Sequence, residues 1–117
     1  MHTRAKKILD FWFKETPPKK RLQKHKDFDE LIKKNFLKDY ELASINEYDD
    51  WQDSPLGSLA LIILFDQFSR NMFRDESKAF SQDHKARLIV NDSVYAGFLD
   101  EMDQDQRLFM KIGRAHV

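Results

Sequence analysis

The sequence predicts an all-α protein, and three observations support this fold class. Glycine and proline each occur only three times among 117 residues, whereas strand-rich folds need many turns. Apolar residues recur at intervals of three and four along several segments, which is typical of helices that bury one face. The pair Ser54-Pro55 is typical of a helix start, with serine as the N-cap and proline in the first turn.

The first helix is expected over residues 3–14. Its apolar residues have the spacing of one helical face: Ala5, Ile8, Leu9 and Trp12. Pro17 and Pro18 should end this helix, because proline lacks the amide hydrogen that a helix interior needs. A basic connector at residues 19–26 follows.

The second helix is expected over residues 27–44, where apolar residues again recur on one face. Asp27 and Glu30 have the spacing of a capping box, in which each side chain accepts a hydrogen bond from the other residue's backbone amide. Residues 46–53 are acidic and polar, so we interpret them as a loop.

The third helix starts at Ser54-Pro55 and should be the most buried one. In residues 56–65, eight of ten side chains are apolar, and a helix that is apolar all round belongs in the interior. A buried strand is the alternative, but the Ser-Pro start favours a helix. The pattern breaks after Met72.

Two further helices complete the predicted fold. Asp83 is interpreted as the N-cap of a fourth helix, which should end near Gly97 because glycine readily adopts the left-handed conformation at helix ends. Asp103 and Gln106 repeat the capping-box spacing and open a fifth helix.

The composition argues against several classes of function. Lysine plus arginine and aspartate plus glutamate both number 20, so the basic excess of a typical nucleic-acid-binding protein is missing. Cysteine is absent, which excludes disulfides and thiolate metal sites and is compatible with a cytoplasmic location. The longest apolar run, residues 59–65, is far shorter than the roughly 20 residues of a membrane-spanning helix. The histidines lack ligand spacing, and nucleotide-binding glycine motifs are missing. We therefore expect no nucleic acid, membrane, metal or cofactor.

The sharpest local feature is a group of polar residues at the end of the most buried helix, here named the polar cluster: Asp66, Gln67, Arg70, Asn71 and Arg74. Asp66 follows seven apolar residues, so its carboxylate should be at least partly buried, which is costly without a partner. Arg70, four residues further on, is the nearest candidate partner.

Three interpretations of the polar cluster stay open. In the first, the cluster fastens the helix end to a neighbouring loop, and Gln67 and Asn71 satisfy backbone groups. In the second, Arg70, Asn71 and Arg74 bind an anion or a peptide carboxylate. In the third, Asp66 acts as a general acid or base, together with a partner residue that the sequence does not identify.

A series of motifs runs along the chain: the aromatic segment 8–13, Trp51, Pro55, and residues 59–71, where an apolar run ends in Asp-Gln-Phe-Ser-Arg-Asn. This series resembles the bacterial family called domain of unknown function 924. The resemblance implies an all-helical, tetratricopeptide-like array of antiparallel helix pairs, and it implies no established activity. Fold analogy to tetratricopeptide arrays suggests binding, by association only.

The C-terminus departs from this family, whose members continue past Phe109 into further helices that carry a His-Ser-Glu motif. Residues 112–117 instead read as the translation of a common sequencing-adapter oligonucleotide. We expect residues 1–111 to be the N-terminal part of a longer helical domain, truncated at its C-terminus, and residues 112–117 to be a non-native tail; a natural tail is the alternative. Helix faces that the missing part would cover should then be exposed, which predicts a marginally stable fragment.

The sequence therefore predicts a binding or interaction module whose site is the polar cluster. The expected partner is a peptide or small anionic ligand, another protein, or a second copy of the chain. The alternative is a small cytoplasmic enzyme in which Asp66 acts with residues of the missing C-terminal part, and the catalytic residues of such an enzyme are unknown.

Overall fold

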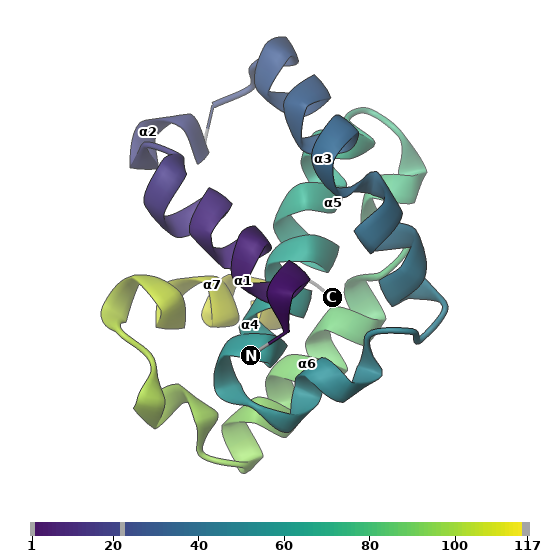
Figure 1. The fold of residues 1–117 in the computed structure, drawn as a ribbon. Coiled ribbons are helices and arrows are strands. Elements are labelled where there is room, and N and C mark those ends of the chain that lie inside the picture. The colour runs from purple at the N-terminus through teal and green to yellow at the C-terminus, as the bar shows by residue number, and fades with distance from the viewer. Residues whose placement is uncertain (1, 22, 116–117) are drawn as a thin grey trace.

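The computed structural model describes residues 2–21 and 23–115, and these residues form helices and turns without any strand. The predicted all-α fold is confirmed. The α-helices are α1 Thr3–Asp10, α2 Pro18–Arg21, α3 Lys26–Ser44, α4 Pro55–Ile62, α5 Ser69–Met72, α6 Asp83–Tyr95 and α7 Gln104–Ala115 (Figure 1). Shorter turns join them: the π-helical turns Phe11–Glu15 and Ile63–Phe68, and the 3-10 turns Asp49–Asp53, Ser77–Phe80 and Phe98–Glu101.

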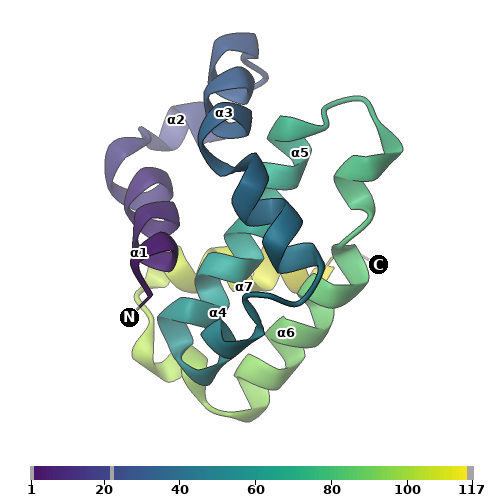
Figure 2. The same cartoon turned by 45° about the vertical axis from the view of Figure 1, so that its right-hand side comes forward.

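One long helix lies at the centre of the molecule. It consists of α4, the π-helical turn Ile63–Phe68 and α5, which follow one another without leaving the right-handed helical conformation at Ile63 or Ser69. Figures 1 and 2 show α1, α3, α6 and α7 arranged around it. A central position requires apolar residues on every side of the helix, and residues 59–65 supply them.

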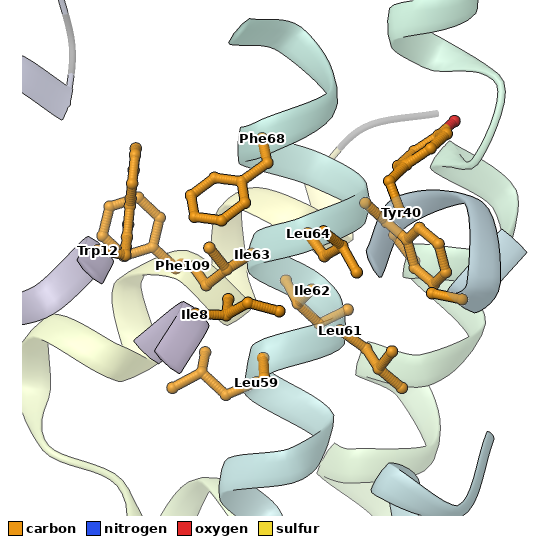
Figure 3. Packing of buried hydrophobic residues seen from close by; sticks show 14 of the residues in the cluster. Ile8, Trp12, Tyr40, Leu59, Leu61, Ile62, Ile63, Leu64, Phe68 and Phe109 are labelled. Atoms are coloured by element: carbon orange, nitrogen blue, oxygen red, sulfur yellow. The ribbon is translucent and has the colours of Figure 1, made fainter. Parts of the chain in front are cut away.

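The core forms where the surrounding helices meet the central helix. Figure 3 shows Ile8 and Trp12 of the N-terminal helix on one side of it and Tyr40 of α3 on the other. Seven successive residues of the central helix, 59–65, are each at most 1% exposed. Phe109 of α7 packs edge-on against the Trp12 ring, with ring centroids 5.5 Å apart, so α7 contributes to the same core.

The start of the central helix agrees with the sequence prediction. The Ser54 hydroxyl accepts a hydrogen bond from the Gly57 amide at 3.0 Å, as an N-cap does. Asp103 and Gln106 also form the predicted reciprocal capping box, with distances of 3.0 and 2.8 Å. Gly97, which follows α6, has a φ of 79°, as expected for a glycine at a helix end.

Two predicted helix N-caps are wrong, one by two residues and the other by one residue. The N-cap of α3 is His25, whose Nδ1 accepts a hydrogen bond from the Phe28 amide at 3.4 Å. Asp27 therefore lies inside the first turn, where its charge still interacts favourably with the helix dipole. Gln82, not Asp83, is the N-cap of α6, and the Asp83 carboxylate contacts Arg70 instead.

The C-terminal helix α7 continues into the predicted tail. Gly113 is buried, and a Cβ at this position would lie 3.1 Å from Ile62 and 3.4 Å from Val90. The non-native origin of residues 112–117 stays a prediction from the sequence, and residues 116 and 117 of this tail lie outside the described residues. Within the described part of the chain, no helix combines the length and the apolar character needed to cross a bilayer.

Candidate functional site

Arg70 forms the centre of one half of the polar cluster. Its two terminal nitrogens donate to the carboxylate of Asp83 in α6, at 2.8 and 3.1 Å. The same guanidinium lies 3.3 Å from the Asp66 carboxylate and donates to the Ala79 carbonyl at 3.3 Å. Its carbon lies 4.9 Å from the centre of the Phe80 ring. Arg70 therefore joins the end of the central helix to α6 and to the turn Ser77–Phe80.

Asp66 and Gln67 form the buried side of this half. Asp66 is 1% exposed, and its carboxylate accepts a hydrogen bond from the side-chain amide nitrogen of Gln67 at 2.9 Å. The predicted pairing of Asp66 with Arg70 is present, but Asp83 is the closer partner of Arg70. Gln67 donates to this carboxylate, whereas the sequence interpretation assigned it to a backbone group.

Asn71 and Arg74 form the other half of the polar cluster, around Asp29 of α3. Arg74 donates to both Asp29 oxygens, at 2.5 and 2.9 Å, and the Asn71 amide donates to one of them at 2.9 Å. The helix ends at Met72, so Arg74 lies beyond it and reaches α3 from the following turn. The structure thus divides the predicted cluster between two carboxylates.

The contacts at Asp29 change the acid–base properties of both partners. Partial burial by itself would raise the pKa of the Asp29 carboxyl, but the hydrogen bonds from Arg74 and Asn71 outweigh burial and lower this pKa below 3.8. The hydrogen bond to Asp29 raises the pKa of Arg74 in turn. This pair is therefore charged on both sides at neutral pH.

Sequence reasoning did not identify Asp29, Asp83 or Phe80 as members of this site. Asp29 and Asp83 lie in the first turns of α3 and α6, where acidic residues are common for reasons of helix stability alone. Arg74 and Asp29 are 45 residues apart in the chain, and Arg70 and Asp83 are 13 residues apart. Pairs this far apart produce no local sequence pattern. Only the folded arrangement of the helices brings them together.

A second buried carboxylate, that of Asp39, lies between α1 and α3, and no pattern in the sequence indicates it. Asp39 accepts hydrogen bonds from Arg4 at 2.6 and 3.1 Å and from the Tyr48 hydroxyl at 2.7 Å. Burial and the bond to Asp39 raise the pKa of Tyr48 to about 12. Tyr48 stacks on Trp51 with centroids 4.1 Å apart. Asp39 thus joins α3 to α1 through Arg4 and to the turn that follows α3 through Tyr48, which indicates a structural role.

Among the described residues, no group of three or more histidine, aspartate or glutamate side chains is arranged to hold a metal ion. The carboxylates of Asp66, Asp29 and Asp83 are contacted by arginine and side-chain amide donors. A surface hollow of about 940 Å³ lies along α7, between Asp103 and Lys111, and no polar-cluster residue lines it.

Comparisons with known proteins identify the family. The model of a family described as bacterial protein of unknown function, DUF924, matches residues 8–117. A solved structure of a protein of unknown function from Agrobacterium tumefaciens shares 32% sequence identity and superposes with a TM-score of 0.92. The match covers 97% of this chain and 64% of that one, so the chain spans less than two thirds of the length of this relative. Among curated proteins, none matches the chain. The chain therefore belongs to the DUF924 family of bacterial proteins of unknown function.

Proposed function

We propose that this chain is an interaction module that binds a carboxylate-bearing ligand, such as a peptide or a small anion, at Arg70. One observation carries this proposal: Arg70 already holds a carboxylate, that of Asp83, through both terminal nitrogens at the partly exposed edge of the polar cluster. The planar fork of arginine matches a carboxylate with two parallel hydrogen bonds. A ligand would take the place of Asp83 in this arrangement.

The surroundings of Arg70 favour exchange at Asp83 and not at Asp66. The Asp83 side chain is 19% exposed and that of Asp66 is 1% exposed, so solvent and ligands reach only the former. Asp83 lies in the first turn of α6, where the partial positive charge of the helix end would stabilise its carboxylate after release. Asp66 would meanwhile keep the guanidinium in position.

Phe80 indicates which kind of carboxylate fits. This residue is 58% exposed, and the Arg70 guanidinium lies over its ring. Exposed aromatic and arginine side chains that lie together are typical of the residues that dominate protein interfaces. A ligand with an apolar group next to its carboxylate would contact the ring and the guanidinium at the same time. In this proposal, Gln67, Asn71 and Arg74 keep the helix end in place.

The alternative function, an enzyme that uses Asp66, has less support. A general acid or base must come within hydrogen-bond reach of its substrate, whereas Asp66 is buried and held by Gln67 and Arg70.

The cytoplasmic location, the tetratricopeptide-like stacking and the truncation of the domain remain predictions from the sequence.

The test is an NMR titration with N-acetylphenylalanine, which carries a carboxylate beside an aromatic ring. Binding should shift the Nε–H resonance of Arg70 and the amide resonances of the turn Ser77–Phe80. Asp83→Asn removes the internal competitor, so we expect it to tighten binding by roughly tenfold, because less of the site is then blocked. Arg70→Lys has no Nε–H resonance to follow, and it should abolish the shifts of the amide resonances of the turn Ser77–Phe80.

Arg107→Lys is a matched control, because Arg107 is also held by a backbone carbonyl, that of Leu99 at 2.8 Å, outside the proposed site. This variant should bind like the wild type. Thermal unfolding of each variant separates loss of binding from loss of folding. If the Arg70 resonance stays unshifted in both the wild type and Asp83→Asn, the proposed ligand site is wrong and the cluster only fastens helices together.

A further inference from the structure

A hollow of about 310 Å³ lies between α1 and α3. Charged and aromatic residues of α1, of the turn Phe11–Glu15 and of α3 line it, among them Arg4, Lys7, Asp10, Phe11, Glu15 and Phe36. Binding sites for small molecules typically have volumes of about 300–1,000 Å³, so the hollow has room for a small molecule. None of its lining residues belongs to the polar cluster.

The buried part of the lining is aromatic. Phe36 is 4% exposed, and the Phe11 ring packs edge-on against it with ring centroids 5.2 Å apart. The Arg4 guanidinium lies over the Phe36 ring, with its carbon 5.8 Å from the ring centre. Apolar surface and a guanidinium therefore lie side by side, as in sites that bind the apolar part of a molecule and orient it through a few polar groups.

Arg4 is held in place with one of its donor groups free. Its Nε and Nη2 atoms donate to the buried Asp39 carboxylate at 3.1 and 2.6 Å, and Nη2 also donates to the Asn35 carbonyl at 3.1 Å. Its other terminal nitrogen, Nη1, forms no hydrogen bond within the part of the chain that the structure describes. The Arg4 side chain is 41% exposed. Nη1 can therefore donate to a ligand carboxylate without disturbing the contacts that hold the guanidinium.

Two charged residues of the lining, Lys7 and Glu15, form no ion pair with any residue that the structure describes. By contrast, Asp10 is paired with lysines on both sides of it in the sequence, at 2.7 and 3.4 Å, and Asp39 balances the charge of Arg4. The unbalanced charges of the hollow are therefore a positive one on Lys7 and a negative one on Glu15. These residues lie about 12 Å apart along the helix, at 1.5 Å per residue.

We propose that this hollow binds a small ω-amino carboxylate, which is a molecule with a carboxylate and an ammonium group at opposite ends of an apolar chain. The carboxylate would accept hydrogen bonds from Nη1 of Arg4 and lie near the Lys7 ammonium. The apolar chain would lie against the Phe11 and Phe36 rings, and the ammonium group would pair with Glu15.

The arrangement of charges selects this class over simpler ligands. A simple anion would use only the basic end of the hollow, and a simple amine would use only the acidic end. An α-amino acid carries its two charged groups on the same carbon atom, too close together to reach both Lys7 and Glu15. A ligand with opposite charges at its two ends balances both residues at once, which is the electrostatic complementarity that gives binding its specificity.

The binding is expected to be weak, because ion pairs with exposed side chains contribute little. We expect a dissociation constant on the order of 1 mM. The hollow shares no residue with the site proposed at Arg70, so the two proposals can fail independently.

An NMR titration with ε-aminocaproate tests the proposal. The Nε–H resonance of Arg4 and the backbone amide resonances of Lys7, Phe11 and Glu15 should shift and saturate. Caproate lacks the ammonium group and hexylamine lacks the carboxylate, so each should bind about fivefold more weakly or worse. The proposal is overturned if no saturable shift occurs up to about 20 mM, well above the expected constant, or if caproate binds as tightly as ε-aminocaproate. Shifts confined to the turn Ser77–Phe80 would place the ligand at the Arg70 site and would overturn it too.

Charge-removing variants test the two ends of the hollow separately. Lys7→Gln and Glu15→Gln alter exposed side chains, and each should weaken binding of ε-aminocaproate by about three- to fivefold. Lys111→Gln and Glu41→Gln are matched controls, because they remove the same charges from exposed residues outside the hollow; both should bind like the wild type. Thermal unfolding confirms that each variant is folded. Equal affinities of all four variants would contradict the proposed roles of Lys7 and Glu15.

Discussion

At the scale of single residues, each arginine of the polar cluster has its closest carboxylate partner on another helix. Arg70 uses Asp83 of α6, and Arg74 uses Asp29 of α3. Because both carboxylates accept two hydrogen bonds from a guanidinium fork, the pairs specify distance and orientation as well as charge. The end of the central helix is therefore fastened to two of its neighbours.

The Asp29 pair predicts a specific dependence of stability on pH. The folded-state pKa of Asp29 is lowered from the value of 3.8 that the unfolded chain retains. Its stabilising effect is therefore complete above pH 3.8 and is lost as the pH falls through the lower, folded-state pKa. Asp29→Asn should reduce the free energy of unfolding at pH 7 by about 1–3 kcal/mol. The difference from the wild type should shrink in the acid range below pH 3.8.

Urea unfolding at a series of pH values measures this difference directly. Asp27→Asn serves as the control, because Asp27 is an exposed carboxylate on the same turn of α3; it should lose only the interaction with the helix dipole, less than about 1 kcal/mol at pH 7. A difference between Asp29→Asn and the wild type that stays constant down to the lowest pH would show that the Asp29 charge does not stabilise the fold.

At the scale of elements, the sequence identified the helices better than their ends. The central helix was predictable because its apolar residues and its Ser54-Pro55 start point to the same structure. The π-helical turns Phe11–Glu15 and Ile63–Phe68 had no recognisable signal, since the apolar spacing continues through them. The cap of α3 was missed because His25 is an uncommon N-cap, whereas Asp27 and Glu30 fit a familiar pattern.

Gly57 shows that the start of α4 depends on close backbone packing. A Cβ at this position would lie 2.1 Å from the Trp51 carbonyl oxygen and 2.9 Å from the Ser54 hydroxyl. Replacing a helical glycine with alanine normally stabilises a helix by about 1 kcal/mol. Here the sign should reverse: Gly57→Ala should lower the free energy of unfolding by about 1–3 kcal/mol, because a fixed carbonyl blocks the methyl group.

Urea unfolding measures the free energy of unfolding of Gly57→Ala, and Ser54→Ala is measured in parallel for comparison. The latter removes only the cap hydrogen bond and should cost about 1 kcal/mol. Stabilisation by Gly57→Ala would mean that the turn Asp49–Asp53 moves away from α4 without cost, contrary to the close packing in the structure.

At the scale of the whole molecule, the arrangement of helices depends on contacts between residues far apart in the chain. The sequence did not predict these contacts. Arg21 is the clearest example. It belongs to the basic connector, yet its side chain is 6% exposed. It donates to the Trp12 and Phe13 carbonyls at 3.0 and 3.3 Å and to Asp105 of α7 at 3.1 Å. A run of lysines and arginines reads as a solvated segment, so nothing in the sequence distinguishes this arginine from its neighbours.

Arg21 should therefore determine how firmly α7 is held. Its guanidinium also lies within 5.3 to 5.8 Å of the ring centres of Trp12, Phe13 and Phe109, so it packs against the aromatic groups that α7 covers. Arg21→Ala would leave two carbonyls without this donor and should destabilise the docking of α7 by about 1–3 kcal/mol. Arg21→Lys keeps the charge but loses the fork, so its effect should be intermediate.

Hydrogen exchange of individual amides measures this effect where it is expected. The amides of α7 should exchange faster in Arg21→Ala, whereas those of α3, which Arg21 does not contact through its hydrogen bonds, should keep their rates. Lys19→Ala is the control, because Lys19 is an exposed residue of the same short helix α2. Equal exchange of α7 in Arg21→Ala and Lys19→Ala would mean that the apolar contacts of α7, those of Phe109 and Met110 among them, hold this helix without Arg21. A uniform increase over the whole chain would instead mean that α7 cannot leave the core without global unfolding.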